Sequence, residues 1–252
     1  REKEILNLKD VKLANYSKPF NLSFFENEIV SITGLIGSGK TALASQIFGL
    51  NPDPKVTMTL NGNSYSPQSP EHAISAGVFM CPKDRASNAV VSEFDISNNL
   101  ALPFFKRHSR LSFIRNKSLT QNARNSINEL GIVCQSEMDS VTTLSGGNQQ
   151  KVMVGRWLAE DSSVLLLDEP FQGVDIKARR DIGHQIRSTS RQRATIIFVA
   201  ELDEALEIAD RVIVLHEGNL VGDYQNKSKN IPKIVSSFSG SANNLDSANY
   251  GT

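Results

Sequence analysis

The sequence predicts an α/β fold in which helices pack against a sheet with parallel strands at its centre. A glycine-rich loop, residues 34–41, lies between a β-branched run and a helix-prone run. The apolar run Val164 to Leu167 is too short for a helix and is typical of a buried parallel strand. Helix-like and strand-like segments then alternate from residue 178 to residue 215. At 252 residues the chain can bury a full core, as one large domain or as a domain with an inserted lobe.

The glycine-rich loop has the complete pattern Gly-x-x-x-x-Gly-Lys-Thr, between a strand-like run at 28–33 and a helix-like run at 42–48. Backbone N–H groups can converge on phosphate oxygens there because Gly37 and Gly39 carry no side chain. Lys40 can reach the terminal phosphates of a nucleotide, and the Thr41 hydroxyl can ligate Mg²⁺. The expected phosphate-binding residues are Gly34, Leu35, Ile36, Gly37, Ser38, Gly39, Lys40 and Thr41. An ordinary glycine-rich turn is the alternative, but spacing, lysine, threonine and context all favour a nucleotide site.

Charge and cysteine content argue against several classes of protein. Basic and acidic residues number 27 each, so no electrostatic footprint for DNA or RNA is present. Cys81 and Cys134 form no C-x-x-C pair, which predicts buried free thiols in a reducing cytoplasm. No apolar run approaches the length of about 20 residues that a membrane-spanning helix needs, so we expect a soluble domain. The first residue is Arg1 instead of Met, which suggests a processed product or a segment of a longer polypeptide.

Two smaller layers are expected beside the α/β core. Residues 5–25 and 56–60 read as short antiparallel strands, with a tight turn at Asn61-Gly62, and residues 70–76 as a short helix. Residues 84–158 read as an inserted helical lobe, with a helix start near Ser97 and an amphipathic helix at 119–130.

The middle of the lobe is unusually apolar for a surface connection. Its apolar side chains include Phe104, Phe105, Phe113 and Ile114. Either a local mini-core or a partner-binding surface would explain them. Beyond the core, residues 239–252 are small and polar and are expected to be a disordered tail, so the folded domain would span residues 1–238.

Two further motifs carry chemistry. Ser145 can cap a helix that begins with two glycines, which gives a second anion-binding helix end. The strand at 164–167 stops at Asp168-Glu169, so two carboxylates lie at the carboxyl end of a parallel strand, where α/β sheets bind ligands. Behind a phosphate loop, this pair is expected to be a Mg²⁺ ligand and a water-activating base.

The phosphate loop, the sequence Leu-Ser-Gly-Gly-Asn-Gln-Gln and the apolar run ending in Asp-Glu-Pro together resemble the ATP-binding cassette ATPases, over residues 5–224. Three further stretches resemble the second cassette of the tandem ATPases of simple-sugar importers of the ribose and galactose type. They are Asn148 to Lys151, Asp84-Arg85 and residues 173–175. The resemblance implies a P-loop NTPase fold, with a RecA-like α/β core, an antiparallel β subdomain and an inserted helical subdomain.

The resemblance also implies roles for individual residues. Asp168 would hold Mg²⁺ through water, Glu169 would polarise the attacking water, and Asp175 would lie in the loop that crosses between two cassettes. Tyr16 is a weak candidate for stacking on adenine. The signature residues would act on the ATP of the partner cassette, and they are Leu144, Ser145, Gly146, Gly147, Asn148 and Gln149.

Two positions depart from the family pattern. Lys83 replaces the usual Gln, and Ala200 replaces the usual switch His. An ammonium brings no carbonyl oxygen to Mg²⁺, and a methyl group brings no hydrogen bond to the γ-phosphate. Both ATP hydrolysis and a largely non-hydrolysing, regulatory role therefore stay open for this site.

The implied ligands are ATP and Mg²⁺. The implied partners are a second cassette on the same parent chain, transmembrane permease subunits and, indirectly, a periplasmic or extracellular binding protein, but no nucleic acid. The implied location is the cytoplasmic face of the cell membrane. A cassette protein acting on ribosomes or DNA fits the neutral charge poorly, and a GTPase lacks its Asn-Lys-x-Asp motif.

Overall fold

The computed structural model describes residues 3–83, 90–110, 113–114 and 116–240. The chain divides into two compact units. The first comprises residues 1–80, 162–169 and 190–252, and the second comprises residues 81–161 and 170–189. The second unit is wider than the expected helical lobe at 84–158, because the segment 170–189 belongs to it as well. Residues 84–89, which include Asp84-Arg85, and most of the expected tail lie outside the described residues.

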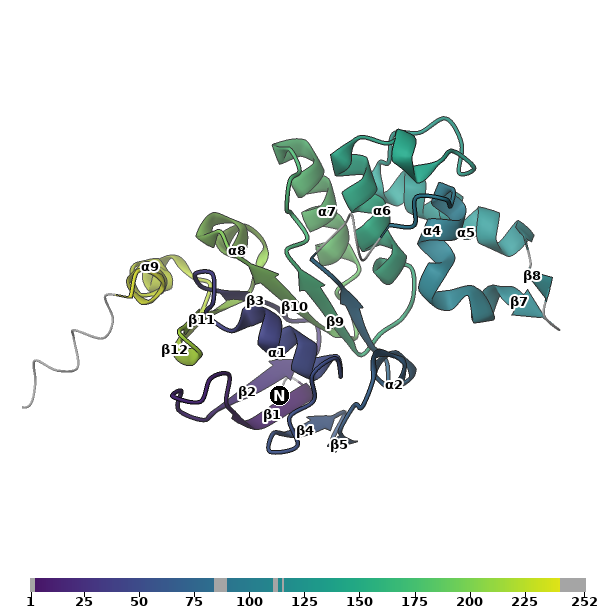
Figure 1. Ribbon diagram of the computed structural model, residues 1–252. Helices are drawn as coiled ribbons and strands as arrows, with labels where there is room; N and C mark the ends of the chain where they lie inside the picture. The colour runs from purple at the N-terminus through teal and green to yellow at the C-terminus, as the bar shows by residue number, and fades with distance from the viewer. Residues whose placement is uncertain (1–2, 84–89, 111–112, 115, 241–252) are drawn as a thin grey trace, which may run out of the picture. The chain divides into compact units, whose positions relative to one another are not determined.

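A six-stranded sheet forms the centre of the first unit, in the order β12-β11-β3-β10-β9-β6 (Figure 1). Strands β11, β3, β10 and β9 are parallel to their neighbours in this set, whereas β12 pairs antiparallel with β11. The strands are β3 (Ile29–Thr33), β6 (Val78–Cys81), β9 (Val164–Asp168), β10 (Ala194–Val199), β11 (Arg211–His216) and β12 (Asn219–Gln225). The expected parallel centre is confirmed, since every residue of β3, β9 and β10 is buried.

An antiparallel four-stranded sheet, in the order β2-β1-β4-β5, completes the β structure of the first unit. Its strands are β1 (Glu4–Val11), β2 (Phe20–Phe25), β4 (Thr57–Leu60) and β5 (Asn63–Tyr65). Asn61 and Gly62 both have positive φ at the turn between β4 and β5, which confirms the predicted hairpin. Side chains from both sheets and from α1 (Lys40–Ile47) share one apolar core that includes Phe24, Leu43 and Phe198.

The remaining helices of the first unit are α2 (Pro70–Ser75), α8 (Leu202–Ile208), the short 3-10 helix η3 (Ser228–Asn230) and α9 (Ile231–Phe238). Helix α8 contacts β3 and β10, and α9 contacts β11 and β12. Among the described residues, no helix combines the length and the apolar character needed to cross a membrane.

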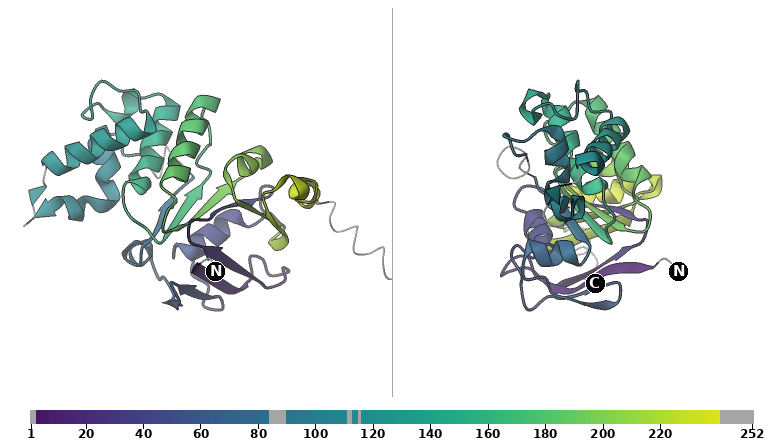
Figure 2. Two further views of the ribbon diagram at one scale, coloured as in Figure 1. Left: turned by 180° about the vertical axis from the view of Figure 1, so that it is seen from behind. Right: turned by 90° about the vertical axis from the view of Figure 1, so that its right-hand side faces the viewer.

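The second unit is a group of helices that lie together in both views of Figure 2. They are α4 (Ile96–Ala101), η1 (Leu102–His108), α5 (Asn116–Leu130), η2 (Val141–Thr143), α6 (Gly146–Leu158) and α7 (Ile176–Ser188), with a two-stranded ribbon of β7 (Ser109–Arg110) and β8 (Phe113–Ile114). Helix α4 begins at Ile96, after its N-cap Asp95, which is one residue earlier than the predicted start at Ser97.

Helix α6 is the centre of the second unit and contacts α4, α5 and α7. Met153, Val154, Trp157 and Leu158 are the apolar residues spaced along one side of this helix, but every residue from Gln150 to Trp157 is buried. Surrounding helices cover the polar side as well. Polar side chains of α6 are therefore forced to find partners inside the unit.

Phe104, one of the apolar side chains in the middle of the expected lobe, belongs to a local core of the second unit. This ring is 5% exposed and meets Trp157 edge to face, with 5.8 Å between ring centroids. Of the two alternatives, the local mini-core is therefore correct for Phe104, because Trp157 of α6 already covers the ring. Phe105 is half-buried and contacts Phe94, while the side chains of Phe113 and Ile114 lie outside the described part of the chain.

Cys81 and Cys134 are free cysteines, as expected. Cys81 is buried, but Cys134 is only half-buried, so the prediction of two buried thiols is correct for one of them. Burial raises the pKa of the Cys134 thiol, which favours its neutral form.

Candidate functional site

The phosphate loop joins β3 to α1 in the first unit, as the sequence predicted. Gly34 and Gly39 are required by their neighbours: a Cβ on Gly34 would lie 2.1 Å from the Leu215 carbonyl oxygen, and one on Gly39 would lie 2.8 Å from Leu13 Cδ1. Gly37 has φ +83°, and an added Cβ there would have no atom within 4 Å. The outer side of the loop at Gly37 is therefore open, which leaves room for a phosphate group.

Polar groups of the loop fit a polyphosphate. The Lys40 ammonium is buried and donates hydrogen bonds to the carbonyl oxygens of Gly34 and, at 3.4 Å, Leu35. The Ser38 hydroxyl oxygen is buried and has no hydrogen-bond partner within the described protein. The first N–H groups of α1 follow directly, with Gly39 at the N-cap and Thr41 exposed. This combination supplies positive charge and donors to an anion at a helix N-terminus.

Two other loops of the first unit hold the phosphate loop in place. Leu13, in the β1–β2 connection, is the residue that an enlarged Gly39 would meet. Gly218, in the β11–β12 turn, donates its N–H to the Ser38 carbonyl oxygen at 3.1 Å. Neither contact leaves a pattern in the sequence, because both join segments far apart along the chain.

Tyr16 lies on the same β1–β2 connection as Leu13, and its side chain is 76% exposed. An exposed aromatic ring on a loop that contacts the phosphate loop is available to a base or to another flat group.

The acidic pair lies at the carboxyl end of β9. Asp168 is opposite Phe198 of β10, and Val199 of β10 is in turn opposite Thr33 of β3, the residue that precedes the phosphate loop. The ends of three parallel strands thus bring Asp168 and the phosphate loop to one edge of the sheet. Both Asp168 and Glu169 are buried, at 3% and 7% exposure.

Glu169 has an unusual backbone and a fixed side chain. Its φ is +50°, a left-handed value that is costly for a residue other than glycine. Its N–H donates to the Phe198 carbonyl oxygen at 2.8 Å, and its Oε2 accepts the N–H of Ala200 at 3.2 Å. The position that lacks the switch His therefore still contributes a backbone donor that holds this carboxylate.

The signature residues lie in the second unit, at the start of α6. Ser145 is the N-cap, and its hydroxyl accepts the Asn148 N–H at 3.4 Å. Leu144 is buried, and its carbonyl oxygen accepts a hydrogen bond from Gln149 Nε2 at 3.2 Å. Gly146 and Gly147 form the first turn between them. The Asn148 side chain also contacts Ser145 and Val133, which the spacing of the motif did not reveal.

Two other expected residues belong to the second unit. Asp175 is the N-cap of α7, and its Oδ1 accepts the Ala178 N–H at 2.8 Å. Lys83 is exposed.

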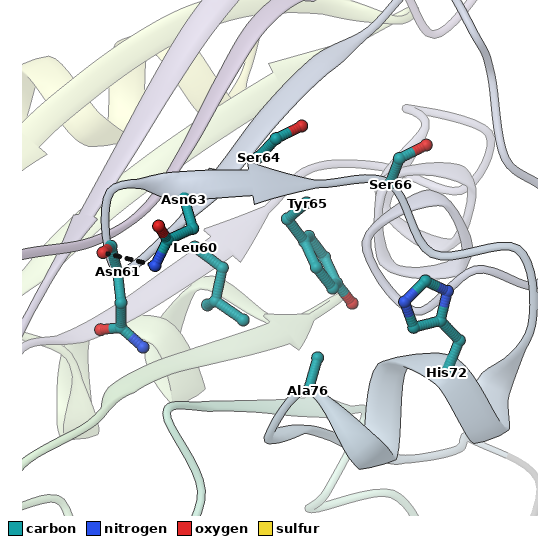
Figure 3. Close-up of a pocket in the computed structure, with 8 residues that line it drawn as sticks. All are labelled: Leu60, Asn61, Asn63, Ser64, Tyr65, Ser66, His72 and Ala76. Carbon is teal, nitrogen blue, oxygen red and sulfur yellow. Dashed lines mark hydrogen bonds between the residues drawn. The ribbon is translucent and has the colours of Figure 1, made fainter.

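A pocket of about 480 Å³ lies elsewhere in the first unit, between the β4–β5 hairpin and α2. Figure 3 shows the Tyr65 ring pointing toward α2, from which the His72 side chain projects. The Tyr65 hydroxyl donates to the Ile47 carbonyl oxygen at 2.9 Å, and burial raises the pKa of this phenol. None of the expected site residues lines this pocket.

No cluster of three or more His, Cys, Asp and Glu side chains that could hold a metal ion occurs among the described residues. Thr41 and Asp168 nevertheless fit Mg²⁺, which typically takes one or two protein oxygens and completes its shell with water and phosphate oxygens.

Comparison with known proteins identifies the family. The sequence profile of the family described as ABC transporter matches residues 17–172. The arabinose import ATP-binding protein AraG of Pectobacterium atrosepticum is 34% identical over 233 residues, which cover 92% of this chain and 46% of AraG. The xylose import ATP-binding protein XylG of Thermoanaerobacter pseudethanolicus is 36% identical over 219 residues, which cover 85% of this chain and 43% of XylG.

The fold is found in solved structures as well. The structure of cbiO1 from Clostridium perfringens has a TM-score of 0.75 at 17% identity, covering 93% of this chain and 95% of cbiO1. A nucleotide-free ATP-binding cassette from an ABC transporter has a TM-score of 0.74 at 18% identity, covering 92% of this chain and 95% of that cassette.

The fold and the phosphate loop define this protein as a P-loop NTPase. The chain belongs to the ABC transporter family. It spans about half the length of the curated relatives it matches.

Proposed function

We propose that this chain binds Mg²⁺-ATP at the phosphate loop of the first unit and powers the import of a monosaccharide. The observation that carries the proposal is the joint position of the phosphate loop and Asp168-Glu169 at the carboxyl edge of one parallel sheet. The names of the relatives, which are import ATP-binding proteins for arabinose and xylose, support a sugar as the transported solute.

Each residue of the proposed site has a distinct task. Lys40 and the loop N–H groups bind the phosphates, and Thr41 with Asp168 would hold Mg²⁺, the latter through water. Mg²⁺, when bound, neutralises charge on the phosphate oxygens. Glu169 Oε2 is held by the Ala200 N–H, so the carboxylate is oriented to accept a proton from water through its other oxygen.

The partners follow from the signature residues. Ser145 and its neighbours form a helix end suited to an anion, and we propose that this anion is the ATP of a second cassette on the same parent chain. Closure of two cassettes on ATP would then drive permease subunits at the cytoplasmic face of the membrane. A periplasmic or extracellular binding protein would deliver the sugar, without contacting this chain directly.

The rate of ATP hydrolysis at the site of this chain is proposed to be low. A positioned base contributes about 10²–10⁴ to a rate, and each missing transition-state contact at Lys83 and Ala200 can cost about 10²–10³. A nucleotide-binding module with little turnover is thus the second candidate, favoured by these two replacements.

Isothermal titration with Mg²⁺-ATP tests the binding proposal on this chain. Lys40→Ala should weaken binding by at least about 100-fold, because it removes the charge nearest the terminal phosphates. Lys18→Ala, on the exposed β1–β2 connection, is the control for loss of a positive charge. Equal affinities for the Lys40→Ala variant and the parent would refute the assignment.

Steady-state hydrolysis by the full-length protein separates the two candidates. If this chain mainly completes the site of its partner cassette, Ser145→Arg should lower turnover more than Glu169→Gln does. The reverse result, in which Glu169→Gln abolishes turnover and Ser145→Arg leaves it unchanged, would contradict the proposed division of labour.

A further inference from the structure

The Ser145 hydroxyl accepts two hydrogen bonds from one residue. Asn148 donates to Ser145 Oγ through its backbone N–H at 3.4 Å and through its side-chain Nδ2 at 3.0 Å. A serine hydroxyl has two acceptor lone pairs and one donor hydrogen. Both acceptor positions are therefore taken from within the turn.

The orientation of the Asn148 amide is fixed from its other side. The Val133 N–H, in the connection after α5, donates to Asn148 Oδ1 at 3.1 Å. A peptide N–H can only donate, so Oδ1 must face Val133 and Nδ2 must face Ser145. A flipped amide would place two donors against each other and leave Ser145 without its side-chain donor.

The Val133 segment is itself tied to α6. Lys151, three residues after Asn148 on the same helix face, donates to the Gly131 carbonyl oxygen at 2.9 Å. The same ammonium forms an ion pair with Asp181 of α7 at 2.7 Å, and the Lys151 side chain is 5% exposed. Because Lys151 holds Gly131, the Val133 N–H stays where it can fix Asn148.

We propose that Asn148 is a positioning residue that turns the Ser145 hydroxyl into an obligatory donor. With both lone pairs occupied, the hydroxyl can interact with a further group only by donating its hydrogen, and its partner must be an acceptor. A phosphate oxygen of a nucleoside triphosphate meets this requirement. The inference rests on the proposed role of Ser145 at the ATP of a second cassette, and it assigns to Asn148 the task of setting the polarity of that contact.

Asn148→Asp tests the direction of the Ser145 hydrogen bond directly, because the two side chains have the same shape. The carboxylate can still accept the Val133 N–H, and a negative charge in the first turn of a helix is favourable for stability. It cannot donate to Ser145, however, and will instead accept the Ser145 hydrogen, which turns the hydroxyl inward.

In the full-length protein, Asn148→Asp should lower kcat/KM for ATP hydrolysis by about 10-fold or more, without lowering the melting temperature. Asn125→Asp makes the same change from amide to carboxylate on an exposed residue of α5, outside the signature residues, and is the control, with an expected loss under about threefold. In a Ser145→Ala background, Asn148→Asp should add less than about threefold, because the hydroxyl it acts on is gone.

The outcomes separate this inference from the proposed function. If Ser145→Ala lowers turnover but Asn148→Asp does not, or if the two effects multiply, the positioning role is wrong and the proposed function stands. If neither Ser145→Ala nor Lys40→Ala changes turnover, the proposed function itself fails.

Hydrogen exchange of the Val133 amide gives a readout independent of catalysis and folding yield. Exchange should be slow in the parent and in Asn148→Asp, and faster in Asn148→Ala, which removes the acceptor. Unchanged exchange in Asn148→Ala would overturn the proposed link between Val133 and Asn148.

Discussion

Backbone groups of a neighbouring strand and turn help to hold the phosphate loop of the first unit, whereas the signature turn of the second unit depends on polar side chains. Gly34 fits against the Leu215 carbonyl oxygen, and the Gly218 N–H bonds the Ser38 carbonyl oxygen. In the second unit, Asn148 and Lys151 provide the corresponding support through an amide and an ammonium group. Backbone support requires glycine at fixed positions and leaves a pattern in the sequence, but side-chain support leaves only polar residues in a helix.

The largest difference in the free energy of unfolding is expected between two glycine variants of the phosphate loop. Gly34→Ala would place a methyl group 2.1 Å from a backbone oxygen of β11. Neither the loop nor β11 can move apart to relieve this contact without breaking the sheet. We expect a loss of at least about 3 kcal/mol in the free energy of unfolding. Gly37→Ala meets no atom and suffers only from its φ of +83°, at a cost of about 1–2 kcal/mol.

Urea unfolding of the two variants measures this difference. Similar midpoints for Gly34→Ala and Gly37→Ala would show that the loop is not clamped by β11. The Leu215 carbonyl oxygen would then not be a support of the phosphate loop.

The second contrast concerns buried polar side chains in the second unit. Arg156 of α6 is buried and donates to the Asn99 carbonyl oxygen at 2.7 Å and to Asn99 Oδ1 at 3.2 Å. Burial lowers the pKa of its guanidinium to about 10. Arg156→Met should cost about 2 kcal/mol, because the lost bonds to Asn99 outweigh the relief of burying a charge.

Arg124→Met is the matched control for this variant. Arg124 pairs with Glu137 at 2.9 Å, but its side chain is 60% exposed and water can replace the lost partner. Thermal unfolding should therefore show a much smaller shift than for Arg156→Met. Equal shifts would mean that the buried network adds no stability to the second unit.

The sequence was most informative where a residue type is dictated by the backbone or by burial. The strand, loop and helix around residues 34–41 and the buried strand before Asp168 were found because glycines and apolar runs leave strong patterns. The antiparallel strands and the turn at Asn61-Gly62 were found for the same reason.

What the sequence did not reveal are contacts between distant segments. The apolar pattern of α6 suggested one buried face, yet Gln150 and Arg156 are buried because other helices surround them. Phe104 looked available to a partner because Trp157 is 53 residues away in sequence. The donor that Ala200 offers to Glu169 is a backbone group, which no substitution pattern can report.

A third contrast lies between two glycines of α6. In Gly155→Ala, the new methyl group would lie 2.4 Å from Leu130 Cδ1, whereas in Gly147→Ala it would lie 3.2 Å from Ala178 Cβ. Alanine gains about 1 kcal/mol over glycine in a helix interior. The tighter contact at Gly155 should outweigh this gain by about 1 kcal/mol, since Leu130 is fully buried and cannot move away.

Urea midpoints of the two alanine variants check this expectation. Gly147→Ala should be within about 0.5 kcal/mol of the parent, because Gly147 lies in the first turn of α6, where the gain from alanine is smaller, and its new contact is mild. A stabilised Gly155→Ala would indicate that α5 and α6 pack more loosely than their contacts imply.

The smallest expected effect separates two helix caps of the second unit. Asp175 caps α7 through a bond of 2.8 Å to the Ala178 N–H, while Ser145 caps α6 through a bond of 3.4 Å to the Asn148 N–H. Asp175→Ala should cost about 1 kcal/mol, and Ser145→Ala less than about 0.5 kcal/mol, because the longer bond is weaker and its donor belongs to an exposed turn.

The order in ATP turnover should be the reverse, since Ser145 is proposed to act on a phosphate group. Thermal unfolding and hydrolysis measured on the same two variants therefore test whether a residue can add little to folding because its hydroxyl is reserved for a ligand. A large loss of stability in Ser145→Ala would instead mark Ser145 as an ordinary helix cap.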